Sequence, residues 1–400
     1  MLSKKPRLLP LAPAALAALL CCGNASAEIS DTIHPFVALG YTYDDNLLRS
    51  PDNAPSEQRS DRARQAQGGI LIDRPFGRQK LTGRAKVSRV TFDHYSQLDY
   101  NAKDIGADLS WQLGNRLSGN LGASYVQSLT PFTDSQSDER NLRTQRNQTA
   151  TGAWRFHPSW QLRGSFVRNE FDYELLTQRI NNRTDDLAEI GVDHLAASGS
   201  RIGLVARHLR GKYKSPRILS STLIDDGYTQ DELKLNVSWL YSGVTQVTVL
   251  AGYAKRKHES LAMRDSSGAN GRVGVRWSPL GKVTFTADAW REFAAVESSL
   301  VTNSLNKGGS LGAIWTISAK LQATANVRHD TREFEQVPGV VFNGDGGDRI
   351  NGATAGVTWT PRQSMQVSAT VFRDKRAGSP LIGSSDYKAN GVSINASAQF

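Results

Sequence analysis

The sequence predicts an all-β protein: a transmembrane antiparallel β-barrel of about 18 strands, with short periplasmic turns at one end and long extracellular loops at the other. Three observations predict this fold. Apolar and polar residues alternate with a period of two in many segments, the connectors between these segments are short and long in turn, and tryptophans recur at one position of the repeating unit.

The alternation is clearest between residues 104 and 113. Ile105, Ala107, Leu109 and Trp111 alternate with acidic and small polar residues, so one face of the segment is apolar and the other is polar. The segment has the length that a tilted strand needs to cross a bilayer. The same pattern recurs in the segments 117–125, 233–239, 247–253, 273–277, 283–287, 321–327, 353–359 and 365–371.

The connectors give the number of strands. Short turns are expected near 76–79, 114–116, 157–159, 196–200, 241–244, 279–281, 317–319 and 361–363. Long polar stretches are found at 44–66, 128–145, 214–228, 256–268, 329–350 and 373–387. Each short turn joins two strands, and an opening strand at 34–43 and a closing strand at 388–400 bring the total to about 18.

Tryptophan and the last residues of the chain indicate the same register. Six tryptophans each end an apolar stripe just before a short turn, which predicts an aromatic girdle at the periplasmic interface. These residues are Trp111, Trp154, Trp239, Trp277, Trp315 and Trp359. The last strand alternates from Val392 to Phe400, and a terminal aromatic of this kind is expected to act as the signal for the barrel-assembly machinery.

The first 27 residues predict export. Lys4, Lys5 and Arg7 precede an apolar run over 8–20, and Ala25-Ser26-Ala27 forms a small-residue cleavage site. We therefore expect a signal peptide at 1–27 and an outer-membrane barrel at 28–400. Cys21 and Cys22 raise a lipoprotein alternative, but Leu19 and Leu20 before them are not the small residues that such processing requires. Because both cysteines lie in the leader, the mature chain offers no disulfide or thiolate site.

The mature chain is basic. Without the three basic residues of the leader, it has 45 Lys and Arg against 38 Asp and Glu, a net charge of +7. Export argues against nucleic acid as the partner of this charge. The phosphates of lipopolysaccharide or an acidic substrate are the expected partners, together with outer-membrane lipid.

No specific catalytic constellation is present in the sequence. The seven histidines include no pair at metal-binding spacing, and no G-x-S-x-G motif occurs. We therefore expect neither enzymatic activity nor a metal or other cofactor. Asp44-Asp45 is interpreted as the solvated start of a loop rather than a cation site. The stretch 343–348 is interpreted as a loop tip, because it lacks the glutamate and the spacing of a calcium loop.

The parity of each strand assigns side chains to the lumen, with the apolar residues facing lipid. The basic residues assigned inward are Arg84, Lys86, Arg155, Arg163, Arg207, Lys234, Arg272, Arg276, Lys282, Lys320 and Arg328, and the acidic ones are Asp104, Asp108, Glu189, Asp193, Glu232 and Asp288. Gln112, Gln161, Asn236, Gln322 and Asn326 are assigned there as polar contacts. The basic excess predicts a lumen that favours anions. The alternative is a mixed interior in which arginines pair with carboxylates across strands.

Several segments carry a resemblance to a known family. Residues 41–49 (YTYDDNLLR), 141–146 (NLRTQR), 154–160 (WRFHPSW), 181–184 (NNRT) and 195–201 (LAASGSR) resemble the EpsL-type exopolysaccharide-biosynthesis proteins. The likeness spans essentially the whole mature chain and is most specific in its first half. It implies a role in polysaccharide secretion beside other export proteins, and no catalytic residue is carried over.

The function implied by the resemblance is a passive conduit for an exopolysaccharide chain across the outer membrane, whose lumen arginines and amides form many weak contacts with the moving polymer. Two alternatives stay open. One is a lectin-like surface tether that binds the polymer through loops such as 128–145. The other is a general porin for small anionic solutes.

Overall fold

The computed structural model describes residues 32–52, 59–133, 136–219, 222–260, 264–296, 301, 303–334, 346–379 and 382–400. The expected signal peptide and part of the stretch 343–348 lie outside these residues. Within them, no helix is long and apolar enough to cross a membrane.

The fold is a single sheet of 18 strands, as the alternating connectors predict. Its strands are β1 (Ile33–Asp44), β2 (Asp61–Phe76), β3 (Gln79–Phe92), β4 (Tyr100–Leu113), β5 (Leu117–Leu129), β6 (Leu142–His157), β7 (Trp160–Tyr173), β8 (Arg183–Leu195), β9 (Arg201–Tyr213), β12 (Tyr228–Ser242), β13 (Thr245–His258), β14 (Ser266–Leu280), β15 (Val283–Ala295), β16 (Asn303–Ser318), β17 (Leu321–Phe334), β18 (Gly347–Arg362), β19 (Met365–Ala377) and β20 (Tyr387–Gln399).

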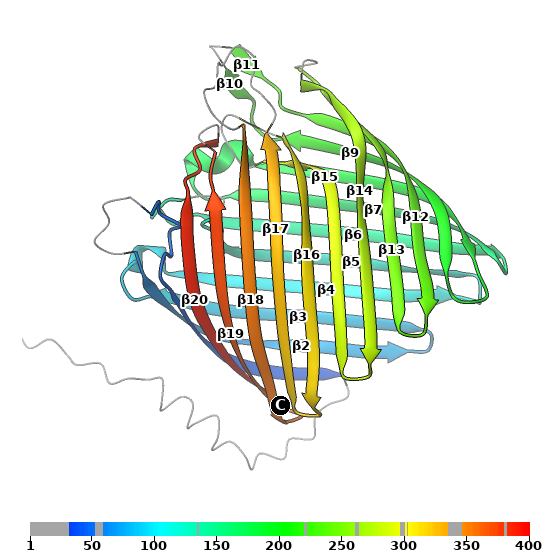
Figure 1. Ribbon diagram of the computed structural model, residues 1–400, viewed down its shortest axis with the longest axis horizontal. Coiled ribbons are helices and arrows are strands. Elements are labelled where there is room, and N and C mark those ends of the chain that lie inside the picture. The colour runs from blue at the N-terminus through cyan, green and yellow to red at the C-terminus, as the bar shows by residue number, and fades with distance from the viewer. Residues whose placement is uncertain are drawn as a thin grey trace, which may run out of the picture.

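Hydrogen bonding closes the sheet into a barrel (Figure 1). Neighbouring strands run antiparallel in chain order, and β1 pairs with both β2 and β20. The backbone N–H of Phe400 donates to the carbonyl of Pro35 at 2.8 Å, next to this closing pair. Because every strand has two partners, no open edge of the sheet faces lipid, which is what a membrane-spanning sheet requires. The role of Phe400 as an assembly signal stays a prediction.

The long connectors contain short elements that the strand pattern does not predict. The connector between β9 and β12 holds a small hairpin of β10 (Arg217–Leu219) and β11 (Thr222–Ile224). Two 3-10 helices, η1 (Ser96–Leu98) and η2 (Leu176–Asn181), lie in the β3–β4 and β7–β8 connectors. The hairpin stands at the top of Figure 1, at the opposite end of the barrel from the C-terminus.

The strand register shows which face each side chain occupies. Residues opposite each other in an antiparallel pair project to the same side of the sheet. Ala85 lies opposite Ile105, and Lys86 lies opposite Asp104. The apolar face carries exposed side chains, such as Ile105 at 52%, whereas the polar face includes side chains that are nearly buried, such as Lys234 at 2%. This distribution of exposed apolar and buried polar side chains is the reverse of that in a water-soluble protein. It is the arrangement of a barrel with lipid outside and polar groups within.

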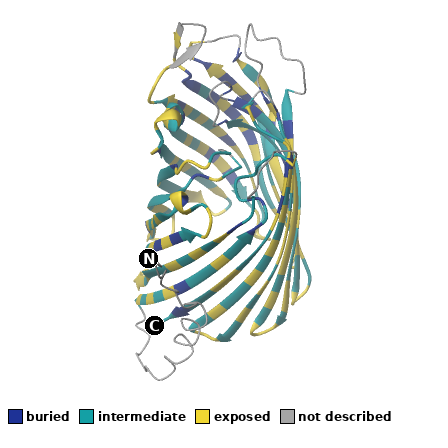
Figure 2. Ribbon diagram, turned by 90° about the vertical axis from the view of Figure 1, so that its left-hand side faces the viewer, coloured by how far each residue is buried: buried dark blue, intermediate teal, exposed yellow. Residues whose placement is uncertain are grey.

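Figure 2 shows the alternation as successive bands of exposed and less exposed residues along the strands. The six predicted tryptophans all lie on the outer face near the short turns; Trp154, for example, is opposite Leu117 and 49% exposed. Neighbouring aromatic rings extend this zone, since Trp239 packs edge-on against Tyr241 at 5.1 Å and Trp277 lies 5.6 Å from Phe285. The positions agree with an aromatic girdle, and contact with the membrane interface stays a prediction.

Candidate functional site: the lumen and its extracellular mouth

The register places most of the sequence-predicted lumen residues on the inner face of the barrel. These are Arg84, Lys86, Arg163, Arg207, Lys234, Arg272, Arg276 and Arg328, with Gln112, Gln161, Asn236, Gln322 and Asn326. All six predicted acidic residues lie there too. Their contact with a transported molecule stays a prediction.

Two of the basic residues predicted in the lumen wall, Lys282 and Lys320, are not part of it, and the inward position of Arg155 stays a prediction. Lys282 and Lys320 lie in short turns between strands, where the side-chain alternation of a strand no longer holds. Arg155 lies beyond Trp154, the last regularly paired residue before a register shift at the end of β6. The side-chain alternation of a strand therefore does not extend to Lys282 and Lys320.

The lumen wall is nearly balanced in charge, which corrects the predicted basic excess. The register adds Lys80, Arg143, Arg183, Arg201, Arg256, Arg332 and Arg376 to the inner face, but it also adds Asp44, Asp61, Asp73, Asp185, Glu292, Asp330, Asp348 and Asp374. Many of these charges form pairs, as the alternative reading of the sequence proposed. Wall charge alone therefore gives little preference for anions.

Glu232 on β12 is the centre of a buried group of inward-facing charges in the lumen wall. Its carboxylate lies 2.8 Å from Nη1 of Arg207 and 2.8 Å from Nζ of Lys234, and it accepts a 3.0 Å hydrogen bond from Asn270. Gln230 also donates to it. Since the side chains of Glu232 and Lys234 are only 5% and 2% exposed, each neutralises the other in a region with little water.

The same network continues on both sides along the wall. Arg207 also pairs with Glu189 on β8, whose carboxylate accepts a 2.8 Å hydrogen bond from Ser165 on β7. Arg256 on β13 donates to Gln230 at 2.7 Å and stacks over Tyr228 with its Cζ 4.3 Å from the ring centre. Strands from β7 to β13 are thus joined by side chains inside the barrel as well as by backbone hydrogen bonds.

Trp290 is an aromatic residue on the inner face of β15. The guanidinium groups of Arg272 and Arg328 lie 5.1 and 5.0 Å from its ring centre, within the range of cation–π contacts. Its indole N–H donates to Asp330 at 3.1 Å. Trp290 was not assigned to the lumen from the sequence, although it lies on the same strand parity as Asp288, which was.

The wall over β4–β9 near the short turns contains a cavity of about 640 Å³. Hydroxyl and amide groups dominate its inward-facing lining: Ser110, Gln112, Ser118, Asn120, Thr149, Thr151, Gln161 and Ser165. Arg163 also lines it and is held at 2.8 Å by Asp193, a fully buried carboxylate that also accepts a 3.0 Å hydrogen bond from Gln161. This wall offers uncharged hydrogen-bonding groups to a polar solute.

At the other end of the barrel, Arg49 ties the loop after β1 to the lumen wall. Its Nη1 lies 2.7 Å from Asp44, its Nη2 lies 3.8 Å from Asp374, and its guanidinium is 5.8 Å from the ring centre of Tyr387. All three partners face the lumen. Among the described residues Arg49 is the one non-glycine with positive φ, at 57°, a conformation that persists when surrounding contacts hold it.

Asp44 is therefore not the solvated loop residue that the sequence suggested. It is 6% exposed, pairs with Arg49, and accepts a 2.9 Å hydrogen bond from the backbone N–H of Asn46. Asp45 accepts two hydrogen bonds from Asn390, at 2.6 and 2.8 Å. Within the described residues, no group of three or more histidine or acidic side chains is placed to hold a metal ion.

The loop between β5 and β6 reaches the opposite part of the mouth. Arg376 on β19 donates to the carbonyl of Thr133 at 2.8 Å. Gln136 donates to the carbonyl of Arg49 at 2.7 Å and accepts a 3.3 Å hydrogen bond from the backbone N–H of Ser385. Because β19 is separated from β5 by five intervening strands, this loop spans part of the opening and joins the loops that follow β1 and β19.

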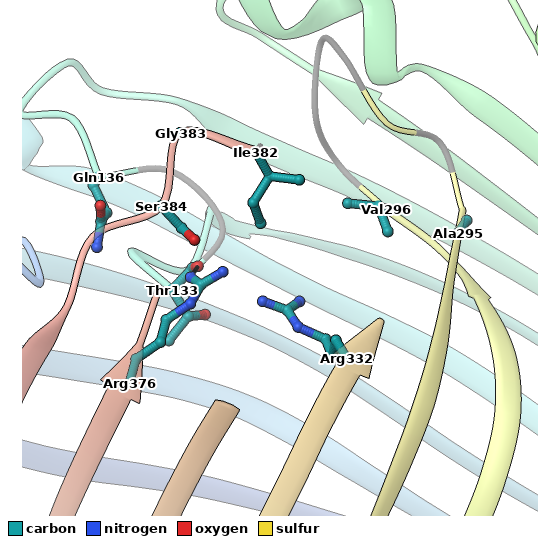
Figure 3. A pocket seen from close by; sticks show the side chains of 9 residues that line it. All are labelled: Thr133, Gln136, Ala295, Val296, Arg332, Arg376, Ile382, Gly383 and Ser384. Atoms are coloured by element: carbon teal, nitrogen blue, oxygen red, sulfur yellow. Dashed lines mark hydrogen bonds between the residues drawn. The ribbon is translucent and has the colours of Figure 1, made fainter. Parts of the chain in front are cut away.

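Arg332 and Arg376 lie beneath these loops (Figure 3). Both pair with Asp348 on β18, which is 4% exposed. They line a cavity of about 270 Å³ together with Thr133, Gln136, Ser384 and the apolar side chains of Val296 and Ile382. Val296 and Ile382 belong to an apolar cluster with Val301 and Phe334, which packs the loop ends together. We call Asp44, Arg49, Arg332, Asp348, Asp374 and Arg376 the mouth cluster.

The mouth cluster is not among the lumen residues that the sequence predicts. Near the extracellular ends, charged residues occupy both faces of the strands, so no apolar stripe marks the alternation. Continuing the parity of Val371 along β19 would place Arg373 and Lys375 outward and Asp374 and Arg376 inward, which is the observed arrangement.

Comparison with known proteins agrees with this geometry. The family model described as "Putative beta-barrel porin 2" matches residues 233–400. The fold is similar to Pseudomonas aeruginosa OccK9 (OpdG), with TM-score 0.50 and 13% identity over 93% of this chain and 99% of that one. It is also similar to the apoprotein form of the FrpB iron transporter from Neisseria meningitidis, with TM-score 0.52 and 10% identity over 93% of this chain and 81% of that one. A search of curated proteins finds no match.

The chain is an outer-membrane β-barrel, and its residues 233–400 are similar to the porin model. The closed 18-stranded sheet, its inverted polarity and the match to a porin model all lead to this assignment.

Proposed function

We propose that this protein is a passive outer-membrane channel for small polar solutes. The observation that carries the proposal is the inward position of three loops, which Arg49, Gln136 and Arg376 tie together across the extracellular mouth. A barrel narrowed in this way favours small molecules over a long polymer. The porin model that matches residues 233–400 supports the same function.

The chemistry of the lumen wall suits a channel that binds solutes weakly and selects little by charge. The charges in the lumen are largely paired, so a solute meets neither a continuous cationic nor a continuous anionic surface. The cavity near the short turns adds hydroxyl and amide groups, such as those of Thr149 and Gln161. Conduction requires sites that bind a solute weakly enough to release it, and dispersed neutral hydrogen-bonding groups meet this requirement.

The second candidate is the exopolysaccharide conduit implied by the EpsL-type resemblance. The same hydroxyl-rich wall is the observation that favours it, because sugar hydroxyls would bind there. However, the resembling segments have structural contacts at the mouth. Asn141 accepts a 3.1 Å hydrogen bond from the backbone N–H of Leu175, and Asn182 accepts one of 2.8 Å from Tyr173. Asp44 and Arg49, which pair with each other at the mouth, belong to another of these segments, 41–49.

A deletion strain separates these candidates and the surface tether. Slower uptake of small polar solutes with normal exopolysaccharide supports the channel. Polymer trapped in the periplasm would support the conduit, and polymer shed into the medium would support the tether. Complementation with the wild-type chain, and with a chain whose residues 130–141 are shortened, would show whether the inward loop limits passage.

A further inference from the structure

The positive charge of the chain is concentrated on the outside of the barrel rather than in its lumen. We define the outer belt as the outward-facing strand residues between the apolar stripe and the extracellular strand ends. In the described strands its acidic residues are Glu170, Asp172, Asp186, Asp231 and Glu333, on β7, β8, β12 and β17. Its basic residues occur on β2, β3, β4, β6, β7, β9, β13, β15, β16, β18, β19 and β20.

The belt is densest in basic residues over three adjacent strands. Arg349 lies on β18, Arg373 and Lys375 lie on β19, and Lys388 lies on β20. All four side chains are exposed. Lys375 and Lys388 are directly opposite each other in the antiparallel register, an arrangement that is unfavourable unless an anion lies between them. We call these four residues the β18–β20 patch.

The protein supplies little counter-charge to this patch. Among the described residues, Arg349, Arg373 and Lys375 form no ion pair, and the ammonium of Lys388 pairs with Asp52 alone, at 3.4 Å with both side chains about half exposed. Asp45 approaches the same edge but already accepts two hydrogen bonds from Asn390.

Strand alternation explains why the patch is unneutralised. The acidic residues of these strands, Asp348 and Asp374, project inward, where they face arginines of the mouth cluster. Each outward cation is therefore separated by the sheet from the nearest carboxylates of its own strand. An anion that neutralises the patch has to come from outside the barrel.

The position of the patch along the barrel axis identifies the source of that anion. Arg373 is the next outward-facing residue after Val371 on β19. Val371 is apolar and 55% exposed. The patch thus begins where the lipid-facing apolar stripe ends, on the side of the long extracellular loops. Charged groups at this level meet the headgroups of the outer leaflet.

We propose that the β18–β20 patch binds the phosphate groups of lipopolysaccharide in the outer leaflet. Two arginines can each hold a phosphate through paired N–H donors, and two opposed lysines add point charges beside them. Such a contact would fix one side of the barrel to the lipid, independently of what passes through the lumen.

Native mass spectrometry of the detergent-solubilised barrel tests this site. Diphosphoryl lipid A is titrated onto the wild type, onto the triple variant Arg349→Gln, Arg373→Gln, Lys375→Gln, and onto a control triple variant Lys282→Gln, Lys320→Gln, Arg362→Gln. The control removes three exposed cations at the opposite end, two in short turns and Arg362 at the end of β18. Monophosphoryl lipid A and phosphatidylglycerol serve as further ligands.

We expect the patch variant to bind diphosphoryl lipid A at least about tenfold more weakly than the wild type, since each basic residue near an anionic surface contributes appreciably. The control variant should bind like the wild type, and monophosphoryl lipid A should bind more weakly than the diphosphoryl form. Unchanged binding by the patch variant would overturn the proposal. Equal loss in the control, or equal binding of phosphatidylglycerol, would also overturn it by showing attraction to net charge or to any phosphate.

Folding is checked by the heat-dependent mobility of the barrel in gels. Because the substituted side chains are exposed, the variants should fold. If the triple variant does not, the pairs Arg373→Gln with Lys375→Gln, and Arg349→Gln with Lys388→Gln, are each expected to weaken lipid A binding severalfold. Wild-type affinity in both pairs would contradict the site.

Discussion

Arg376 and Asp348 form a buried ion pair at the extracellular mouth, with Nε of the arginine 2.8 Å from Oδ2 of the aspartate. Their side chains are 2% and 0% exposed. Because Arg376 also donates to the carbonyl of Thr133, the pair connects two strands of the wall to the loop between β5 and β6. The narrowing of the channel therefore depends on a small number of buried charges.

Replacing Arg376 with alanine should widen the mouth. The change leaves Asp348 with Arg332 as its remaining partner and releases the carbonyl of Thr133, and the loss of one partner from a buried pair costs about 3 to 5 kcal/mol. We expect larger and noisier single-channel conductance in planar bilayers. The control is Arg373→Ala, which removes an exposed arginine three residues away on the outer face. Equal conductance in the wild type and Arg376→Ala would show that the loop does not limit the current.

Replacing Glu232 with glutamine should destabilise the barrel. The variant leaves Lys234 and Arg207 without their shared carboxylate, and since Lys234 is 2% exposed, we expect a loss of about 3 to 5 kcal/mol in the free energy of unfolding. Asp231→Asn is the matched control. This neighbouring carboxylate is 70% exposed and pairs with His208 on the outer face, so its loss should cost less than about 1 kcal/mol. Urea unfolding in lipid vesicles, followed by tryptophan fluorescence, measures both variants.

The near balance of lumen charges predicts weak ion selectivity in the wild type. Replacing Arg163, Arg272 and Arg276 together with glutamine should shift the reversal potential in a KCl gradient toward potassium selectivity. The physical reason is that Glu292 then loses Arg272, and Asp193 loses Arg163 and retains only the more distant Arg201 at 4.0 Å. Lys320→Gln, in the short turn between β16 and β17, should leave the reversal potential unchanged. A strongly anion-selective wild type would contradict the balanced wall.

The aromatic girdle can be tested by fluorescence quenching. Lipids brominated close to the headgroup should quench the outward tryptophans near the short turns strongly, whereas lipids brominated near the chain ends should quench them weakly. Trp290, on the inner face, should resist both. A variant that retains Trp315 and Trp290 as its two tryptophans allows the signals to be separated. Stronger quenching of Trp315 from the bilayer centre would show that it is not at the interface.

The strands and their faces could be predicted from the sequence because a side-chain period of two is a property of the extended backbone. Where the outer face is apolar, as at Val247, Val249 and Ala251, the two faces are distinguished by composition alone. The eight short turns could also be located, since glycine, proline and polar residues interrupt the alternation there. These features fixed the number of strands without any knowledge of their pairing.

The mouth cluster and the outer belt could not be predicted, because composition no longer separates the faces near the extracellular ends. Residues 373–376 of β19 are consecutively Arg, Asp, Lys and Arg, so their composition does not distinguish the faces, and their pairing with β18 and β20 shows that Asp374 and Arg376 face inward. Contacts such as that between Arg376 and Thr133 join residues far apart in the chain, and a loop's path depends on these contacts rather than on local sequence. The sequence therefore suggested a basic lumen, whereas the excess charge lies outside.

Liposome swelling with solutes of increasing size tests the central claim most directly. Proteoliposomes containing the wild-type barrel should swell rapidly in monosaccharides and amino acids and progressively more slowly in longer oligosaccharides, because the loops held by Arg49 and Arg376 narrow the mouth. The Arg376→Ala variant should admit the longer solutes faster. Rapid entry of long oligosaccharides through the wild type, at a rate similar to that of monosaccharides, would contradict a channel for small solutes and favour a polymer conduit.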